Sequence, residues 1–205
     1  MDQVFLLSPA RCDGARAQLL MNPAATFDLA ARLRADSGAS LGEVFSFLSG
    51  LYFRGKLAYA TTFGRTTPET PSSWIITTDR GLATPDLAVR RNDLIAFSQI
   101  DIGSGDERYV APLRRDAERL AAAIGSTTRV ILLGSIATGK YADILAEIFD
   151  DRLLFPIDFV GRGDMSRGGL LLRCAREGRQ LEYASVLGAS RHGKRPPKLG
   201  PLPSR

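Results

Sequence analysis

Residues 129–141 constrain the fold of this chain more than any other stretch. The four apolar residues Val130–Leu133 predict a short buried strand. A glycine-bounded turn over 134–141 follows, and the apolar residues of 141–148 then recur at helical spacing. A strand, a tight turn and a helix in this order direct backbone N–H groups at the helix N-terminus toward an anion. The stretch therefore predicts an α/β fold with an anion site at this turn.

The turn nearly matches the phosphate-binding P-loop, G-x-x-x-x-G-K-[ST]. Its glycines and Lys140 have the expected spacing, but Tyr141 replaces the small hydroxyl residue that ligates Mg²⁺. The apolar run 153–157 with Asp158 also imitates a Walker B strand. A P-loop-like nucleotide binder is therefore kept as an alternative, although little sequence remains to build a parallel sheet around the motif. The residues predicted to hold one anionic group are Gly134, Ser135, Lys140 and Tyr141.

Length and composition predict one ordinary globular domain. The chain has 205 residues, of which 44% are hydrophobic and 24% charged, enough for a sizeable core. No apolar run approaches the roughly 18 residues of a membrane span, and no signal peptide is recognised at the N-terminus. We therefore expect a cytoplasmic protein with no membrane partner. Cys12 and Cys174 are expected to be free thiols there, and two cysteines with one histidine predict no metal site and no cofactor.

The basic charge is concentrated at the C-terminus. The net charge is +5, and residues 191–205 contain five basic residues, four prolines and no acidic residue. An α/β domain is predicted over 1–190, close to neutral, followed by an extended basic tail. The tail either keeps the protein in solution or binds the phosphates of a polyanion, and composition leaves both interpretations open.

Two further strands are predicted to end in polar turns. The run 4–7 leads into a loop over 8–14, and the β-type run 74–78 leads into Asp79 and a turn. Ligands of α/β sheets bind at the carboxyl ends of strands. The residues predicted to contribute to a site at these ends are Ser8, Arg11, Cys12, Arg80 and Gly81. The alternatives are that Cys12 is inert packing, that Arg11 is a surface charge, and that Arg80 and Gly81 belong to a connecting loop.

Helical patterns alternate with these strands. Helices are predicted over 15–21, 26–35 and 108–124, and over a run that starts at Ser40, breaks near its glycines and carries a Ser40–Glu43 capping box. A further helix is predicted over 170–177 and a last strand over 181–187. The alternation predicts an α/β domain with a central mixed or mostly parallel sheet flanked by helices.

Residues 161–169 form a second glycine-rich segment, with four glycines. Glycine lets a backbone approach a ligand closely, and such a segment buries little, which favours a site over packing. Arg162 and Arg167 would bind phosphate or carboxylate, with Ser166 beside them. Asp164 would act as base or nucleophile, or would only cap the helix that follows.

The order of three motifs resembles that of the YaaA-like group of bacterial proteins. The first strand leads into Ser8-Pro9-Ala10, a later strand into residues 77–82 and the pair Pro85-Asp86, and another strand into Gly134 and Gly139-Lys140-Tyr141 before a helix. Arg80 and Arg11 differ from the tyrosine-like residue and the lysine usual in that group, and 161–169 has no counterpart. The resemblance implies association with nucleic acid in a stress or DNA-maintenance setting, and no particular reaction.

Two hypotheses follow beside the P-loop alternative, all with DNA, RNA or a nucleotide as partner. The first is a nucleic-acid- or nucleotide-directed α/β enzyme that cleaves or exchanges a base at its N-glycosidic bond. Asp164 and Cys12 would be its catalytic residues, with Asp164 stabilising or attacking the cationic sugar carbon, and Lys140, Arg162 and Arg167 would hold phosphate. The second is a non-catalytic DNA-binding protein of a stress or DNA-maintenance pathway. The sequence predicts no oligomeric state.

Overall fold

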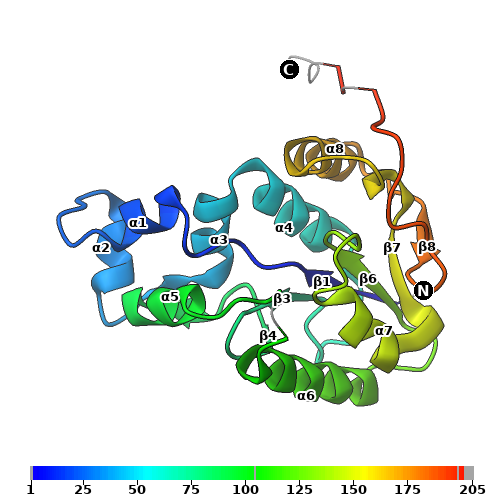
Figure 1. The fold of residues 1–205 in the computed structure, drawn as a ribbon, viewed down its shortest axis with the longest axis horizontal. Coiled ribbons are helices and arrows are strands. Elements are labelled where there is room, and N and C mark those ends of the chain that lie inside the picture. The colour runs from blue at the N-terminus through cyan, green and yellow to red at the C-terminus, as the bar shows by residue number, and fades with distance from the viewer. Residues whose placement is uncertain (1, 104, 198, 201–205) are drawn as a thin grey trace.

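A mixed, mostly parallel sheet forms the middle layer of the protein (Figure 1). The computed structural model describes residues 2–103, 105–197 and 199–200. Its strands are β1 (Gln3–Leu7), β2 (Ala39–Ser40), β3 (Ser73–Ile76), β4 (Leu82–Ala83), β5 (Ala88–Val89), β6 (Arg129–Leu133), β7 (Leu153–Pro156) and β8 (Tyr183–Ser185). Six of them pair in the order β4-β3-β1-β6-β7-β8. The β3-β1-β6-β7 pairs are parallel and the outer strands β4 and β8 antiparallel, which confirms the predicted fold class.

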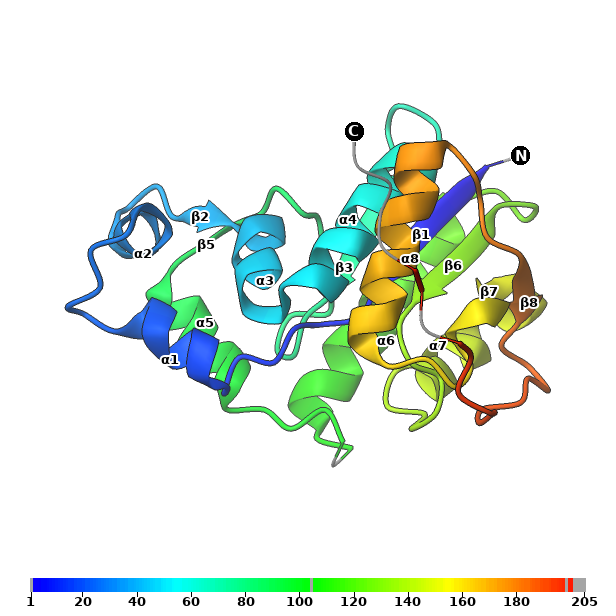
Figure 2. The same ribbon diagram turned by 90° about the horizontal axis from the view of Figure 1, so that it is seen from above.

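Helices cover both faces of this sheet. They are α1 (Ala15–Met21), α2 (Asp28–Arg34), α3 (Leu41–Ser49), α4 (Leu51–Phe63), α5 (Arg91–Ser98), α6 (Glu107–Ala123), α7 (Ala142–Phe149) and α8 (Asp164–Glu177), with 3-10 turns at Asp150–Arg152 and Ile157–Phe159. Helices α4 and α8 lie on one face, and α6 and α7 on the other (Figure 1). Helices α1, α2, α3 and α5, with the short β2–β5 ribbon, form a lobe beyond the carboxyl end of β1 (Figure 2).

The central strands are buried because their side chains alternate between two cores. Phe5 and Leu7 of β1 join the cluster under α4 and α8, while Val4 and Leu6 join the cluster under α6 and α7. All four side chains are fully buried. A strand covered on both faces reads as a continuous apolar run, and this is why the sequence pattern located β1 and β6 well.

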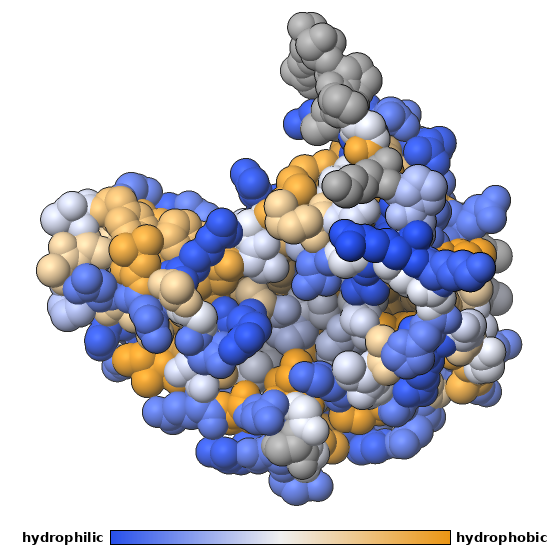
Figure 3. Space-filling model, turned by 45° about the horizontal axis from the view of Figure 1, so that its top comes forward, coloured by the Kyte–Doolittle hydropathy of each residue, from blue (hydrophilic) through white to orange (hydrophobic). Residues whose placement is uncertain are grey.

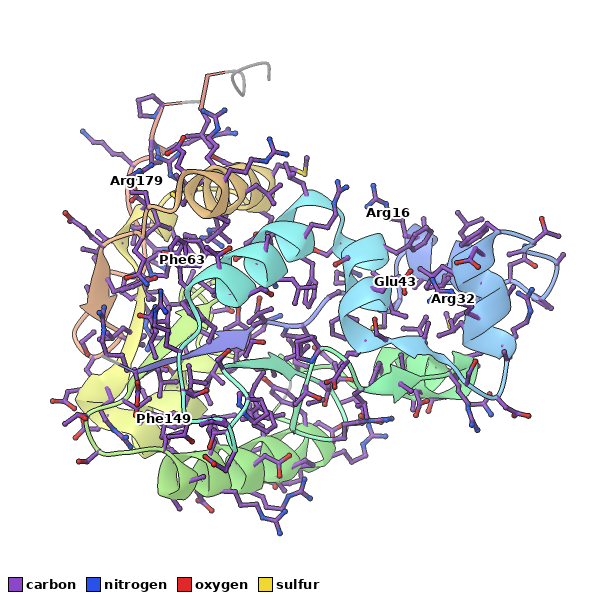
Figure 4. All side chains as sticks on the ribbon, turned by 180° about the vertical axis from the view of Figure 1, so that it is seen from behind. Arg16, Arg32, Glu43, Phe63, Phe149 and Arg179 are labelled. Atoms are coloured by element: carbon purple, nitrogen blue, oxygen red, sulfur yellow. The ribbon has the colours of Figure 1, made fainter. Side chains whose placement is uncertain are left out.

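The run breaks at Gly50, between α3 and α4, and not just before Lys56 as expected, since α4 continues through Gly55 and Lys56. The φ of 59° at Gly50 explains this glycine. The capping box forms only in part. The Ser40 hydroxyl accepts a hydrogen bond from the Glu43 N–H, but the Glu43 carboxylate accepts one from Arg32 of α2 at 2.8 Å instead of capping its own helix. Figure 4 shows Arg32 and Glu43 pointing toward each other.

Close helix packing explains Gly168, one of the four glycines of 161–169. Helix α8 begins at Asp164, so the second half of this segment is helical and not a loop. A Cβ on Gly168 would lie 2.6 Å from the Leu51 carbonyl oxygen, and a Cβ on Gly55 would lie 2.6 Å from the Gly168 carbonyl oxygen. Helices α4 and α8 thus approach so closely that no side chain fits between them. The prediction that this composition serves a site rather than packing is wrong at Gly168.

Replacing Gly168 with alanine is expected to destabilise the protein by about 1–3 kcal/mol, because the added methyl overpacks the α4–α8 contact. Gly169→Ala is the matched control, since its Cβ would meet Leu199 at an ordinary 3.6 Å. That control should be neutral or up to about 1 kcal/mol more stable, because alanine favours helix. Urea unfolding followed by the fluorescence of Trp74, the only tryptophan, measures both. Equal midpoints for the two variants would contradict the packing account.

The described part of the tail lies against the body of the protein. The Arg173 guanidinium donates a hydrogen bond to the Gly200 carbonyl, and Arg191 forms an ion pair with Asp143. Both Cys12 and Cys174 are buried free thiols, as predicted. Over the residues that the structure describes, no helix has the length and apolar character needed to cross a membrane.

Candidate functional site

The candidate site lies where β1 and β6 end side by side. Leu7 pairs with Leu133, and the Ser8 N–H donates to the Leu133 carbonyl at 3.2 Å, so Ser8 and Gly134 follow as neighbours. After β1 the chain builds β3 on one side of this strand and later returns to build β6 on the other. Ligands of open α/β sheets bind at such a switch point, outside the carboxyl ends of the strands.

Two adjoining pockets open at this edge, in the hollowed surface between the lobe and the sheet (Figure 3). The first, called the serine pocket, has a volume of about 410 Å³. Its lining residues are Ser8, Pro9, Ala10, Arg11, Leu48, Ser49, Tyr52, Ile102, Ser135, Thr138, Lys140, Tyr141 and Asp164. The second, called the Cys12 pocket, has about 540 Å³ and shares Arg11, Ile102 and Lys140 with the first. Together they have room for a ligand of nucleotide size.

A buried lysine supports the wall of the serine pocket. Lys56 of α4 is 1% exposed, and its Nζ donates to the Ser8 carbonyl at 2.6 Å and contacts the Ser8 Oγ at 2.9 Å. The ammonium also lies 4.6 Å from the ring centres of Tyr52 and Phe53. No carboxylate among the described residues lies within ion-pair distance of it.

Burial lowers the pKa of Lys56 to about 7, because the charged form loses its hydration. The carboxylate of Asp164 acts in the opposite direction and raises this pKa, while the guanidinium of Arg167 lowers it further. The amine is therefore poised to gain or lose a proton near neutral pH, as a group engaged in proton transfer needs to be.

Tyr141 lies beside Ser8 in the wall of the serine pocket. Its hydroxyl oxygen accepts the Ser135 N–H at 2.8 Å, and the Ser8 side chain acts to lower the pKa of the phenol. Burial raises the pKa of Tyr141, so the phenol keeps its proton at neutral pH. A Cβ on Gly134 would lie 2.8 Å from the Tyr141 hydroxyl and 2.9 Å from the Ser8 Cβ, so only glycine permits this approach.

The contact between Tyr141 and Ser135 distinguishes this turn from a phosphate-binding P-loop. The Ser135 N–H, which a P-loop would direct at phosphate, is bound to the Tyr141 hydroxyl. Tyr141 therefore replaces the Mg²⁺-ligating hydroxyl residue with a side chain that organises Ser8. Lys140 beside it is exposed and lines both pockets, where it can reach an anionic ligand.

The structure brings together six of the residues predicted from the sequence: Ser8, Arg11, Ser135, Lys140, Tyr141 and Asp164 all line the serine pocket. Gly134 packs directly behind Ser8 and Tyr141. Asp164 is the exposed first residue of α8, and one of its carboxylate oxygens lies 3.5 Å from Arg167. Arg11 extends from the loop after β1 and is paired with Asp13 at 2.9 Å.

Cys12 lies in the neighbouring pocket and is poorly suited to nucleophilic attack. It is 4% exposed, and burial raises the pKa of its thiol to about 12. Asp13 and Asp79 raise this pKa further, because their charges oppose the thiolate. The thiol is therefore protonated at neutral pH, and the reactive thiolate is scarce.

Arg80 and Gly81 lie outside both pockets. The chain after β3 turns directly back into the antiparallel β4, so this corner is a hairpin and not a strand-to-helix turn. Arg80 pairs with Asp79 and Asp93, and a Cβ on Gly81 would meet Asp116 of α6. The structure therefore assigns these two predicted site residues to the hairpin.

The arginines of 161–169 do not line the serine pocket. Arg162 donates to the Ser166 hydroxyl at 3.2 Å, and both line a separate pocket of about 430 Å³ next to the tail. Arg167 is 9% exposed and donates twice to the Phe159 carbonyl, at 2.9 and 3.2 Å. Of the predicted residues in this segment, only Asp164 lines the serine pocket.

Comparisons with known proteins assign no function to this site. The chain matches no family model, and no curated protein and no solved structure gives a significant match. The resemblance to YaaA-like proteins stays a prediction.

Sequence reasoning missed Lys56 and Tyr52, although a signal was present. Tyr52, Lys56, Tyr59 and Phe63 recur at helical spacing, which places a lysine on the apolar stripe of α4. A cation on a buried stripe needs a partner, and here the partner is Ser8, 48 positions earlier in the chain.

Proposed function

We propose that the chain is a nucleotide-directed enzyme that cleaves or exchanges a base at its N-glycosidic bond in the serine pocket. One observation carries this proposal: an exposed carboxylate, Asp164, and two cations, Arg11 and Lys140, border a single pocket at the carboxyl ends of β1 and β6. A carboxylate and separate cations in one pocket suit a ligand that has an anionic group and develops positive charge elsewhere.

Asp164 would act on the sugar. Breaking an N-glycosidic bond leaves positive charge on the anomeric carbon, and a nearby carboxylate stabilises that charge or attacks the carbon. Asp164 is exposed at the N-terminus of α8, and only its Oδ1 is ion-paired among the described residues, with Arg167 at 3.5 Å, so its Oδ2 is available to a ligand.

Other parts of the wall would bind the rest of the nucleotide. Leu48 and Ile102 supply an apolar surface for a base. The Tyr52 hydroxyl is buried at this wall without a hydrogen-bond partner among the described residues, although the positive charge of Arg167 acts on it. A buried polar atom of this kind is stabilised when a ligand supplies the partner.

Lys140→Ala is expected to weaken binding of a nucleoside 5′-monophosphate about tenfold, because a charge-assisted hydrogen bond to phosphate is lost. Isothermal titration at low salt measures the Kd of both proteins. Lys194→Ala, which removes an exposed cation of the tail outside the serine pocket, should leave the Kd unchanged. Equal losses in the two variants would show that binding reflects net charge alone.

The direct test of the proposed function is base release. The protein is incubated with each nucleoside 5′-monophosphate and with short single- and double-stranded oligonucleotides, and free base is separated by chromatography. Release of a base supports the proposal. Tight duplex binding with a steep salt dependence, no base release, and a shallower salt slope after truncation at Leu187 would favour a non-catalytic DNA-binding protein instead.

A further inference from the structure

We propose that Lys56, Ser8 and Tyr141 form a proton relay that delivers a proton to the leaving base in the serine pocket. This inference rests on the proposed function, because it identifies the acid of the same reaction. Tyr141 would be the catalytic residue that touches the base. Ser8 and Lys56 would act through it.

The relay follows from the placement of three side chains on neighbouring elements. Lys56 of α4 donates to the Ser8 Oγ at 2.9 Å. The Ser8 side chain and the Tyr141 hydroxyl both lie against Gly134, where a Cβ would be 2.9 Å from the Ser8 Cβ and 2.8 Å from the Tyr141 oxygen. The Tyr141 oxygen accepts the Ser135 N–H, which leaves its own proton free to point into the pocket. Both Ser8 and Tyr141 line that pocket, while Lys56 lies behind them, sealed from solvent.

A structural role alone explains Lys56 poorly. Burying an ammonium without a carboxylate partner is costly, and an apolar side chain of similar length would fill the same space between Tyr52 and Phe53. The charged and titratable groups that act on Lys56 or share its surroundings are Asp164 and Arg167 of α8, Tyr52 of α4 and Tyr141. None of them is an ion-pair partner of Lys56.

The proposed step breaks one bond to the base and moves three protons along the relay. The C1′–N bond breaks, its electron pair goes to the base nitrogen, and that nitrogen takes the Tyr141 hydroxyl proton. Tyr141 recovers a proton from the Ser8 hydroxyl, Ser8 recovers one from the Lys56 ammonium, and Lys56 becomes a neutral amine. Water adds its hydroxide to C1′, and its proton returns through Tyr141 and Ser8 to Lys56.

This direction of transfer sets the pH dependence. The relay begins with protonated Lys56, whose pKa lies at about 7 in the folded protein. The rate of base release should therefore be highest below pH 7 and fall about tenfold per pH unit above it. If Lys56 instead removed a proton from Ser8 to make a nucleophile, the rate would rise through the same pH range.

Three variants test the relay. Tyr141→Phe should lower kcat about a hundredfold with little change in Kd, because it removes the transferable proton, together with the acceptor of the Ser135 N–H. Lys56→Met should lower kcat and abolish the fall above pH 7. Lys56→Arg should lower kcat to a similar level with a flat profile, because a guanidinium stays charged but does not give up its proton. Lys194→Met, in the exposed part of the tail, should keep both the rate and the profile of the parent protein.

A second measurement does not depend on turnover. The chain contains four lysines, so protein labelled with ¹³C at lysine Cε gives few signals, and the one lost in Lys56→Met is that of Lys56. A titration midpoint near 7 is expected, and a midpoint near 10 would overturn the relay. Base release with an unchanged pH profile in Lys56→Met would overturn the relay while sparing the proposed function. No base release from any nucleotide would overturn the proposed function itself.

Discussion

Replacing Asp164 with asparagine should reduce kcat for base release at least about a hundredfold, while the Kd for the nucleotide changes less than about threefold. Asparagine keeps the shape of the side chain but removes the charge that would stabilise the cationic sugar carbon. An interaction made only in the transition state lowers kcat without weakening ground-state binding. Single-turnover rates and titration calorimetry on the same protein preparations measure the two quantities.

Asp158→Asn is the matched control for this variant. Asp158 is an exposed carboxylate near the start of α8, with its own arginine neighbour, Arg162, at 3.8 Å, and it lies outside the serine pocket. The control should keep kcat within about twofold. A loss of affinity in Asp164→Asn as large as its loss of rate would contradict a catalytic role, because Asp164 would then contribute to binding only.

The sequence predicted the sheet well because its central strands are buried on both faces. Such strands appear as continuous apolar runs, and β1 and β6 were located within a residue or two. The turn after β3 was misjudged because a strand end looks alike in sequence whether the chain continues into a helix or folds back into β4. Gly168 was misjudged because its close packing against α4 depends on Gly55, more than a hundred positions away.

Only the part of the candidate site that follows from parallel strand pairing could be predicted from the sequence. Ser8 and Ser135 follow two strands that pair in parallel, so any fold with these neighbours brings them to one edge. Lys56 could not be assigned a role in the same way. A lysine in an apolar helix shows that something polar must meet it, but only the packing of α4 on β1 shows that the partner is Ser8.

The sequence also did not show how deeply Lys56 and Cys12 are buried, and burial shifts the pKa values of these two groups in opposite directions. Both groups are removed from water, which lowers the pKa of an amine and raises that of a thiol. Burial therefore leaves the lysine able to exchange a proton at neutral pH, whereas it keeps the cysteine thiol protonated and weakly reactive. This contrast favours the inert interpretation of Cys12, which the sequence had left open beside a catalytic one, and directs attention to the contacts of Ser8.

The free energy of unfolding should increase by about 2–3 kcal/mol as the pH rises from 7 to 9, and Lys56 should cause the increase. Its pKa is about 7 in the folded protein and 10.5 in an unfolded chain. Between these values the unfolded chain binds a proton that the folded chain does not, so stability rises with pH by about 1.4 kcal/mol per unit. Below pH 7 both states are protonated and this contribution is constant.

Urea unfolding of the parent protein, Lys56→Met and Lys194→Met at pH 6, 7, 8 and 9, followed by Trp74 fluorescence, tests this directly. The parent and Lys194→Met should become more stable from pH 7 to 9, and Lys56→Met should stay flat. The range ends at pH 9 because the Cys12 thiol, whose pKa is 9.0 when unfolded and about 12 when folded, destabilises the protein above it. Parallel curves for the parent protein and Lys56→Met would show that Lys56 keeps an ordinary pKa, and the buried amine would then lose its place in proton transfer.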